Sequence, residues 1–422
     1  MRPRVSFRTI FHLALSLAVS LPIFADAALR FQLTTKHWLV LLALNLAIWG
    51  SWPRYRSLAL RQATTTVTLL IAANLLLSPL VHLVLDPPEI TQQPNKHVRF
   101  RHVGETRPGL DGVHEMTIDA RGYRVNGPID YAKKPADVLR IVAIGASTTE
   151  QSDIDDRKTW TWLVAEDLSA VLGRKVEMIN TGVSGTRGPQ YYAALRGSEA
   201  YAPDVALFLL GINDWNAAIK TAYRPPTERV LRLFLPFSFF DSVLFNTFMA
   251  ARGAVVALTG IAPDPGQIWE DDGRFLYRQN NSLERTRKLG RPSDSVDDDY
   301  AVWIGRIMGE CKRRAILCLF IEQPTAYAAD IEAGLRRRLW MTPTSENYTL
   351  SLDDMRRTAA TYNAFLADAA RKAGLPFCAT VPSFPSRLAF FYDDCHFTTE
   401  GSRRLAGIVS TCLLDLRNSF SP

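Results

Sequence analysis

The chain has 422 residues, more than one ordinary domain needs, and 47% of them are hydrophobic, which is ample for a large core. Its net charge of +7 is concentrated near the amino terminus, where residues 1–97 hold nine Lys or Arg against Asp26, Asp86 and Glu89. The rest of the chain carries only about +1, and no run of Lys or Arg there alternates with aromatic residues. The composition therefore argues against a nucleic-acid partner.

Three strongly apolar stretches lie within the first 88 residues, at about 10–28, 38–52 and 65–85. The first and third are nearly free of charge and long enough to cross a bilayer of about 30 Å. The second is short, but Trp38, Trp49 and Trp52 lie at its ends, as interfacial aromatic residues do. We predict a transmembrane anchor over residues 1–88 with the lipid bilayer as its partner. The alternative is that these stretches are buried helices of a soluble domain.

Basic residues predict the orientation of the three spans. Three arginines precede the first span and three separate the second from the third: Arg2, Arg4, Arg8, Arg54, Arg56 and Arg61. With both clusters in the cytoplasm, everything after Leu85 lies outside, so we expect a multi-pass inner (plasma) membrane protein with a periplasmic large domain. Ala25-Asp26-Ala27 could instead be a signal-peptide cleavage site, which would leave a two-span hairpin and the same side for the large domain.

All five cysteines follow the predicted anchor: Cys311, Cys318, Cys378, Cys395 and Cys412. Disulfides are permitted outside the cytoplasm, but an odd count leaves at least one thiol free or paired between chains. The sequence does not determine the pairing. No Cys-x-x-Cys or His-x-x-x-His spacing indicates a metal site, so we predict no metal.

Residues 89–138 are expected to form a linker rich in Pro and Gln and then a polar segment of short strands or loops. Apolar runs of strand length then alternate with helical patterns over residues 139–417. The predicted strands are Leu139–Ile144, Val176–Ile179, Val205–Leu210, Ile316–Ile321 and Phe377–Val381. The predicted helices are Trp160–Leu172, Gln190–Tyr201, Tyr300–Arg313, Leu352–Ala373 and Thr399–Leu416. Such alternation predicts an α/β fold with a parallel sheet between two helical layers, and a ligand site at the carboxyl ends of the strands.

The ends of the first three strands carry candidate functional residues. The first strand stops at Gly145 and presents Ser147 two residues later, which makes Ser147 a candidate nucleophile. Asn180-Thr-Gly-Val-Ser-Gly185 follows the second strand and Gly211-Ile-Asn-Asp214 the third. Taken singly, these segments are typical of a Gly-rich loop and an Asx turn. At one sheet edge, however, the N–H groups of Ser147 and Gly185 and the Asn213 amide would form an oxyanion hole.

His396 is the only histidine after Ser147, and Asp393 precedes it by three residues. A lone histidine is more often structural than catalytic. In a loop, however, a carboxylate three residues away can accept a hydrogen bond from Nδ1–H and orient Nε2 toward a serine. Ser147, His396 and Asp393 are therefore the predicted catalytic triad.

These four segments resemble, in order and spacing, the sequence blocks of the SGNH (GDSL-type) hydrolase family, over about residues 139–415. The resemblance implies a flavodoxin-like three-layer domain. It also implies that Ser147 is the nucleophile, Gly185 and Asn213 are oxyanion donors, His396 is the base and Asp393 orients it, without any cofactor. Ala146 departs from the family pattern, which usually has Asp before the nucleophile, so a contact that stabilises the turn is in doubt.

Two insertions, residues 215–299 and 326–350, interrupt the domain. The apolar part of the first, residues 230–258, is broken by charges and is expected to be a lid, an acyl-binding wall, an amphipathic helix on the bilayer or helices packed on the flank. Arg336, Arg337 and Arg338 in the second could attract an anionic substrate, although such a run is more often a solvated helix face. Trp215 could supply an aromatic platform for a sugar.

The sequence as a whole predicts a membrane-anchored, extracytoplasmic serine esterase that hydrolyses carboxyl (O-acyl) esters through an acyl-enzyme. Its substrate is expected to be an O-acylated glycan or lipid of the cell envelope, and protein partners cannot be inferred. The first alternative is a cell-envelope polysaccharide O-acyltransferase with the same triad. The second is an assembly module whose inherited site is idle.

Overall fold

A computed structural model describes residues 89–102, 107–110, 112–224, 268–271, 287–339 and 348–419. Nearly all of these belong to one compact unit, Glu89–Tyr223 together with Gly260–Pro422. Among the residues described, no helix is both long and apolar enough to cross a membrane. The three predicted spans and the apolar segment 230–258 lie outside the described residues, so the interpretations of these segments stay predictions.

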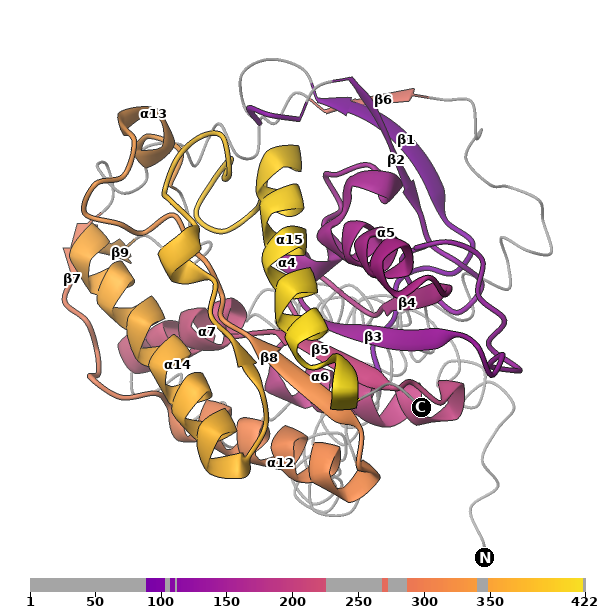
Figure 1. Ribbon diagram of the computed structural model, residues 1–422. Helices are drawn as coiled ribbons and strands as arrows, with labels where there is room; N and C mark the ends of the chain where they lie inside the picture. The colour runs from indigo at the N-terminus through magenta and orange to yellow at the C-terminus, as the bar shows by residue number, and fades with distance from the viewer. Residues whose placement is uncertain are drawn as a thin grey trace, which may run out of the picture. The chain divides into compact units, whose positions relative to one another are not determined.

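The unit is built on a parallel five-stranded sheet with the strand order β10-β8-β5-β3-β4 (Figure 1). The strands are β3 (Leu139–Gly145), β4 (Val176–Asn180), β5 (Val205–Leu209), β8 (Leu317–Ile321) and β10 (Phe377–Cys378). Every residue of β3, β4 and β5 is buried, as expected for strands covered on both faces. The predicted α/β fold with a parallel sheet is thus confirmed.

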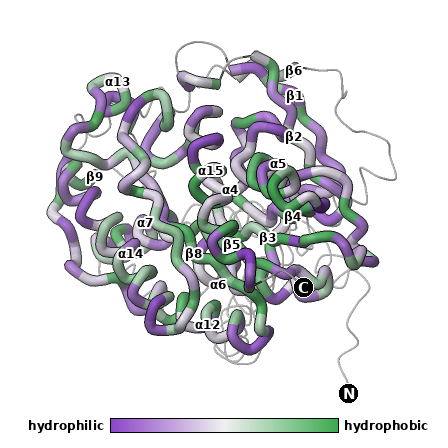
Figure 2. Tube along the Cα trace, viewed as in Figure 1, coloured by the Kyte–Doolittle hydropathy of each residue, from purple (hydrophilic) through white to green (hydrophobic). Residues whose placement is uncertain are grey.

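Two helical layers cover the sheet, and right-handed crossovers determine which helix lies on which face. The main helices are α5 (Trp160–Leu172), α6 (Gly188–Gly197), α12 (Asp298–Arg314), α14 (Leu352–Ala373) and α15 (Thr399–Asp415). The chain reverses direction after β4, so α5 and α15 pack side by side on one face and α6, α12 and α14 on the other (Figure 1). Figure 2 shows hydrophobic residues along the central strands β3, β5 and β8, whereas the helices carry both hydrophobic and hydrophilic residues. The reversal places the switch point of the topology at the carboxyl ends of β3 and β5.

Helix boundaries follow local capping signals. The Thr159 side chain accepts the Trp162 N–H at the start of α5, and the Ser351 side chain accepts the Asp354 N–H at the start of α14. Both helices end at a glycine in the left-handed region, Gly173 with φ 64° and Gly374 with φ 68°. These signals explain why both helices begin and end as predicted.

Three predicted elements differ from the structure. The helix predicted over Gln190–Tyr201 is α6, which ends at Gly197, and Ser198–Tyr201 forms a 3-10 helix, η3. The segment expected to be an Asx turn is the first turn of α7 (Ile212–Tyr223), so the helical layer continues into the predicted insertion. The predicted strand Phe377–Val381 is wrong beyond Cys378, because Val381–Ser383 forms a 3-10 helix, η4, with Pro382 in its first turn.

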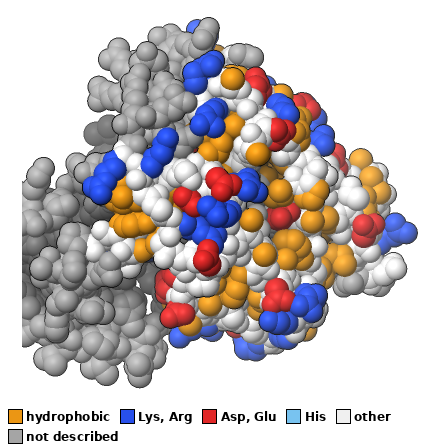
Figure 3. Space-filling model, turned by 90° about the vertical axis from the view of Figure 1, so that its left-hand side faces the viewer, with side chains coloured by type: hydrophobic (Ala, Val, Ile, Leu, Met, Phe, Trp, Pro, Cys, Tyr) orange, Lys and Arg blue, Asp and Glu red, His pale blue; other side chains and the backbone are white. Residues whose placement is uncertain are grey.

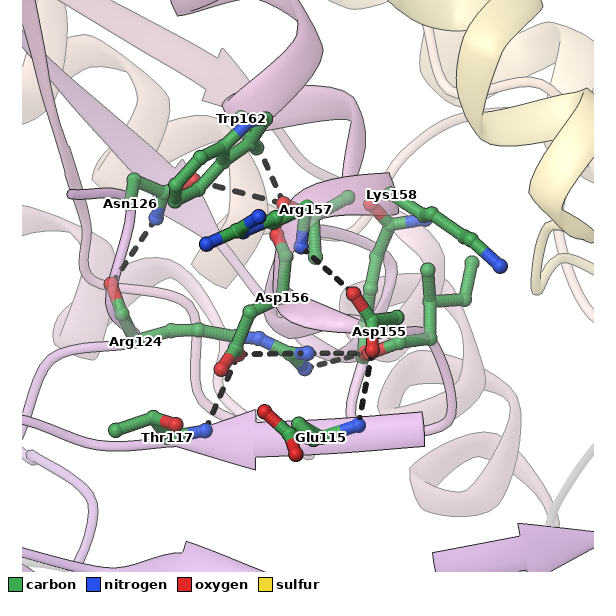
Figure 4. A network of polar contacts seen from close by, with 12 residues as sticks. Glu115, Thr117, Arg124, Asn126, Asp155, Asp156, Arg157, Lys158 and Trp162 are labelled. Atoms are coloured by element: carbon green, nitrogen blue, oxygen red, sulfur yellow. Dashed lines mark hydrogen bonds and ion pairs between the residues drawn. The ribbon is translucent and has the colours of Figure 1, made fainter. Parts of the chain in front are cut away.

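The segment before β3 forms a small sheet with the order β2-β1-β6. Its strands are β2 (Val113–Thr117), β1 (His97–His102) and β6 (Ile268–Asp271), the last from within the first insertion. The N–H groups of Glu115 and Thr117 on the edge strand β2 donate to the carboxylates of Asp155 and Asp156, each at 3.1 Å (Figure 4). These bonds tie the small sheet to the loop that follows the nucleophile segment.

The two insertions meet at a parallel pair of short strands, β7 (Arg287–Leu289) and β9 (Tyr348–Leu350).

On the face shown in Figure 3, acidic and basic side chains of the described residues are interspersed. That mixture agrees with the nearly neutral charge of this part of the chain.

Two disulfides fasten helices to the sheet. Cys311–Cys318 joins α12 to β8, and Cys378–Cys412 joins β10 to α15. Cys395 is buried and is not in a disulfide. The pairing that the sequence left open thus follows the layers, because each bond links a strand to a helix packed on it.

We expect the longer-range disulfide to contribute more stability. Cys378–Cys412 spans 34 residues and Cys311–Cys318 spans 7, and loop-closure entropy predicts about 4 and about 2 kcal/mol respectively. The double variants Cys378→Ser/Cys412→Ser and Cys311→Ser/Cys318→Ser, compared by denaturant unfolding, should lower the free energy of unfolding in that order. The reverse order would show that strain or residual structure outweighs loop length here.

Candidate active site

Ser147 is the first residue of the short helix α4 (Ser147–Glu150), directly beyond β3. The turn between them needs a glycine, because a Cβ on Gly145 would lie 2.1 Å from Thr149 Oγ1 and 2.7 Å from the Leu209 carbonyl oxygen. As the first helical residue, Ser147 has an N–H without an acceptor inside the helix. Its hydroxyl and its N–H are thus both presented at the switch point of the sheet.

The three residues predicted as a triad lie in one hydrogen-bonded chain. Ser147 Oγ is 2.8 Å from His396 Nε2, and His396 Nδ1 is 2.8 Å from Asp393 Oδ2. The other carboxylate oxygen of Asp393 accepts the N–H groups of Cys395 at 3.0 Å and His396 at 2.8 Å. Because Nδ1 faces a carboxylate, its proton lies there, and Nε2 is left to accept the serine hydroxyl.

Electrostatics reinforces this arrangement. Burial alone would raise the pKa of Asp393, but His396 and the two N–H donors hold that pKa below its usual value. Burial alone would lower the pKa of His396, but the Asp393 carboxylate outweighs it, and the net pKa lies well above the usual 6.5. The Tyr392 ring stacks on the imidazole at 5.7 Å, and its hydroxyl donates to Asp153 at 2.7 Å. His396 is therefore a strong base held in one orientation.

Gly185 lies in the loop after β4. Its φ of 81° is in the left-handed region, and this conformation rather than crowding requires glycine, because a Cβ there would meet nothing within 4 Å. The Thr186 N–H donates to the Val183 carbonyl at 3.3 Å, and the Val183 N–H donates to the Gly145 carbonyl at 3.3 Å. The Gly185 N–H donates to no other described residue. It is available to a bound substrate.

Asn213 is joined to the same loop. Its side-chain Nδ2 donates to the Thr186 carbonyl at 3.0 Å, which uses one amide hydrogen, and the second has no acceptor among the described residues. The neighbouring Asp214 accepts the Gly188 N–H at 3.0 Å, and burial raises the pKa of Asp214 to about 7. The three predicted oxyanion donors thus lie on segments that are bonded to one another at the ends of β3, β4 and β5.

Several supporting residues were not predicted from the sequence. Besides Asp214, they are Glu150, which binds the Gly185 loop, Gln323, which accepts a hydrogen bond from Thr148 at 3.3 Å, and Tyr392. Only Asp214 and Tyr392 carry a local signal, because Asp214 ends the segment Gly211-Ile-Asn-Asp214 and Tyr392 directly precedes Asp393. Glu150 and Gln323 bond to residues that are 34 and 175 positions away in the sequence. A single sequence contains no pattern that indicates such distant contacts.

The interpretation of Trp215 as a sugar platform is wrong. Its side chain is 1% exposed. It packs under Gly211, where a Cβ would lie 3.2 Å from the Trp215 ring, and edge-on to Tyr362 at 5.7 Å. As the fourth residue of α7, it points into the core rather than to the site.

Cys395 adds a possible metal ligand beside the triad, since one ligand atom each from Asp393, Cys395 and His396 lie within 4.8 Å of one another. Its Sγ is 3.7 Å from His396 Nδ1. However, Asp393 and Nδ1 already bond to each other, and burial raises the pKa of the Cys395 thiol to about 11, so the thiol stays protonated. This donor set suits a Ser-His-Asp arrangement better than a metal.

Known structures of low identity resemble the chain. A GDSL-like lipase from Bacteroides thetaiotaomicron is 13% identical and the match covers 66% of this chain and 89% of that chain, with a TM-score of 0.34. An acetyl xylan esterase from Geobacillus stearothermophilus is 15% identical over 65% and 94%, with a TM-score of 0.34. A lipase/acylhydrolase from Enterococcus faecalis is 12% identical over 67% and 97%, with a TM-score of 0.34. No curated protein matches the chain.

The family is established by a sequence model instead. The model of the GDSL-like lipase/acylhydrolase family matches residues 143–404, which is more than half of the chain. The match runs from β3, just before Ser147, into α15, just after His396. The chain therefore belongs to the GDSL-like lipase/acylhydrolase family and is an ester hydrolase of the SGNH type.

Proposed function

We propose that this protein is a membrane-anchored, extracytoplasmic serine esterase that hydrolyses carboxyl esters with Ser147 as nucleophile, His396 as base and Asp393 as its orienting acid. The observation that carries the proposal is the chain of two 2.8 Å hydrogen bonds from Ser147 Oγ through His396 to Asp393. No cofactor is needed for this chemistry.

In the first half of the reaction, His396 Nε2 takes the hydroxyl proton as Ser147 Oγ attacks the ester carbonyl carbon. The carbonyl oxygen becomes an oxyanion that accepts hydrogen bonds from the N–H groups of Ser147 and Gly185 and from the Asn213 amide. The C–O bond to the alcohol then breaks, and His396 returns its proton to the departing alkoxide. An acyl-enzyme at Ser147 remains.

In the second half, His396 deprotonates a water, which attacks the acyl carbon and releases the acid. A transferase would need a sugar hydroxyl held in the place of that water. The burial of Trp215 removes the one aromatic platform that the sequence suggested for such an acceptor. This observation supports hydrolysis over transfer.

Two disulfides among the described residues support an oxidising compartment, since cytosolic thiols are normally kept reduced. The arginine pattern around the predicted spans supports the same side of the inner membrane. An esterase held at that surface would meet O-acyl groups on envelope glycans or lipids, which is the substrate class that we propose.

Hydrolysis can be tested directly with the full-length protein. Given an acetyl ester donor and an excess of oligosaccharide acceptor, it should release mainly free acetate, and Ser147→Ala should abolish both turnover and labelling by a fluorophosphonate. Acetylated oligosaccharide as the main product would favour the transferase. Undiminished turnover by Ser147→Ala would exclude the proposed nucleophile.

The pH dependence should report on the Asp393–His396 pair. Only neutral His396 can accept the proton, and its pKa is raised, so kcat/KM should increase with pH through an inflexion above pH 6.5. Asp393→Asn removes the charge that raises this pKa, so the inflexion should move to lower pH while the rate falls by up to about 10⁴-fold.

Asp394→Asn is the matched control, because Asp394 is a neighbouring buried carboxylate that accepts from Tyr327 at 3.0 Å. It should leave the inflexion in place. If the inflexion of the kcat/KM profile is at the same pH in Asp393→Asn as in wild type, a group other than His396 causes it.

The location can be tested with reporter fusions. A reporter that is active only in the periplasm should work when fused after Pro422 or within residues 90–100, and one that is active only in the cytoplasm should fail at both places. The reverse pattern would overturn the predicted number of spans.

A further inference from the structure

The loop that carries Gly185 is bound by a buried carboxylate from the nucleophile segment. Glu150 Oε2 accepts both the N–H of Ser184, at 2.6 Å, and the hydroxyl of Ser184, at 2.5 Å. Glu150 is the last residue of α4 and its side chain is only 4% exposed, whereas Ser184 lies at the surface. The carboxylate thus reaches outward from the turn after Ser147 to hold the residue directly before Gly185.

The far side of Gly185 is held independently. Thr186 Oγ1 donates to the Val183 carbonyl at 2.7 Å, and the Thr186 carbonyl accepts the Asn213 amide at 3.0 Å. The peptide between Ser184 and Gly185 therefore has an anchor on each side. Since Gly185 has no side chain, these anchors determine where its N–H points, together with the turn that the Thr186 N–H closes on the Val183 carbonyl at 3.3 Å.

Glu150 is itself held in place. The buried guanidinium of Arg124 donates to the carbonyl oxygens of Glu150 at 2.9 Å and Gln151 at 2.5 Å. It also pairs with Asp156 at 3.2 Å (Figure 4). A Cβ on Gly182 would lie 2.4 Å from the Glu150 N atom, so the loop and α4 are in direct backbone contact. The buried Ala146 before the nucleophile has no polar side chain that could make an equivalent contact.

We propose that Glu150 is a positioning residue for the oxyanion hole: by fixing Ser184 it aims the Gly185 N–H at the substrate oxygen. This inference rests on the proposed esterase function. The role requires an acceptor oxygen rather than a charge, because both bonds end on one oxygen. Glutamine can supply that oxygen, whereas alanine and methionine cannot.

The test measures kcat and KM of the full-length protein on p-nitrophenyl acetate, per site counted by exhaustive fluorophosphonate labelling. Glu150→Ala should lower kcat per labelled site by about 10- to 100-fold with KM nearly unchanged, which is less than the about 100- to 1000-fold expected for Asn213→Ala. Glu150→Gln should stay within about threefold of wild type. Glu150→Met fills the same space without an acceptor oxygen, so it should lose kcat as Glu150→Ala does. It replaces the alanine variant in the test if that variant does not fold.

Glu310→Ala is the matched control, because Glu310 is also a helical glutamate that is 4% exposed and it bonds to Arg313 at 2.5 Å. It should lower the thermal midpoint while kcat per labelled site stays at the wild-type value. If Glu150 had a purely structural role, Glu150→Ala and Glu150→Met would both behave like this control, with a lower thermal midpoint and wild-type kcat per labelled site. That outcome would overturn the proposal. Equal losses in Glu150→Gln and Glu150→Ala would also overturn it.

The two proposals fail in different ways. A wild-type protein that neither hydrolyses the ester nor takes up the probe would overturn the esterase function and the positioning role together. An active wild type whose Glu150→Met variant keeps full kcat per site would overturn the positioning role alone.

Discussion

Backbone packing at the carboxyl end of β3 determines where the candidate site residues Ser147 and Gly185 lie. At Gly145 there is no space for a Cβ, because Thr149 and the end of β5 lie too close. The same is true at Gly182, which contacts the backbone of Glu150. The nucleophile turn, the end of β5 and the Gly185 loop are therefore in main-chain contact. Oxyanion donors held by such contacts need little reorganisation when charge develops, which is the property that makes them effective.

His396, the proposed base, comes from a distant part of the chain, and its position depends on side-chain bonds. Asp393 is 2% exposed at its side chain, and burying a carboxylate is costly unless it is paired and hydrogen-bonded. Here one oxygen faces His396 and the other accepts two N–H groups of its own loop. The same bonds that compensate for burial also fix the imidazole. The following helix, α15, is further tied to the sheet by Cys378–Cys412.

The parts of the structure that could be predicted are those with a local cause. The buried strand β3 is a continuous apolar run, and α14 is bounded by Ser351 and Gly374, so both follow from the sequence. The motif residues at the strand ends could be grouped into one candidate site because parallel strands bring their carboxyl ends to one edge. The start of helix α7 could not be predicted, because Asn213 and Asp214 favour turns as strongly as they favour a first helical turn.

Contacts between distant segments could not be predicted in this way. The disulfide pairing depends on which helix packs on which strand, and any pairing of the cysteines fits their spacing equally well. The bond between Glu150 and Ser184 joins two residues that are each unremarkable in sequence. The polar neighbours of Trp215 favour a surface position, whereas the helical period turns its side chain into the core.

A short loop that must hold one N–H in a fixed direction needs strong restraints at both ends. Ordering the five residues Ser184–Gly188 costs about 5 to 10 kcal/mol at about 1 to 2 kcal/mol each, and glycine loses the most freedom. The uncharged bonds of Thr186 contribute about 1 kcal/mol each, so they offset only part of that cost. Side-chain carboxyl oxygens supply further hydrogen bonds at either end of the loop, from Glu150 at Ser184 and from Asp214 at Gly188. Both carboxyl groups are buried, which raises their pKa. Glu150 ends the short helix α4 that begins at Ser147, and Asp214 follows Asn213 in α7. Acceptor oxygens at both ends therefore order the loop that carries the Gly185 N–H, and a donor ordered in advance is what the proposed oxyanion hole requires.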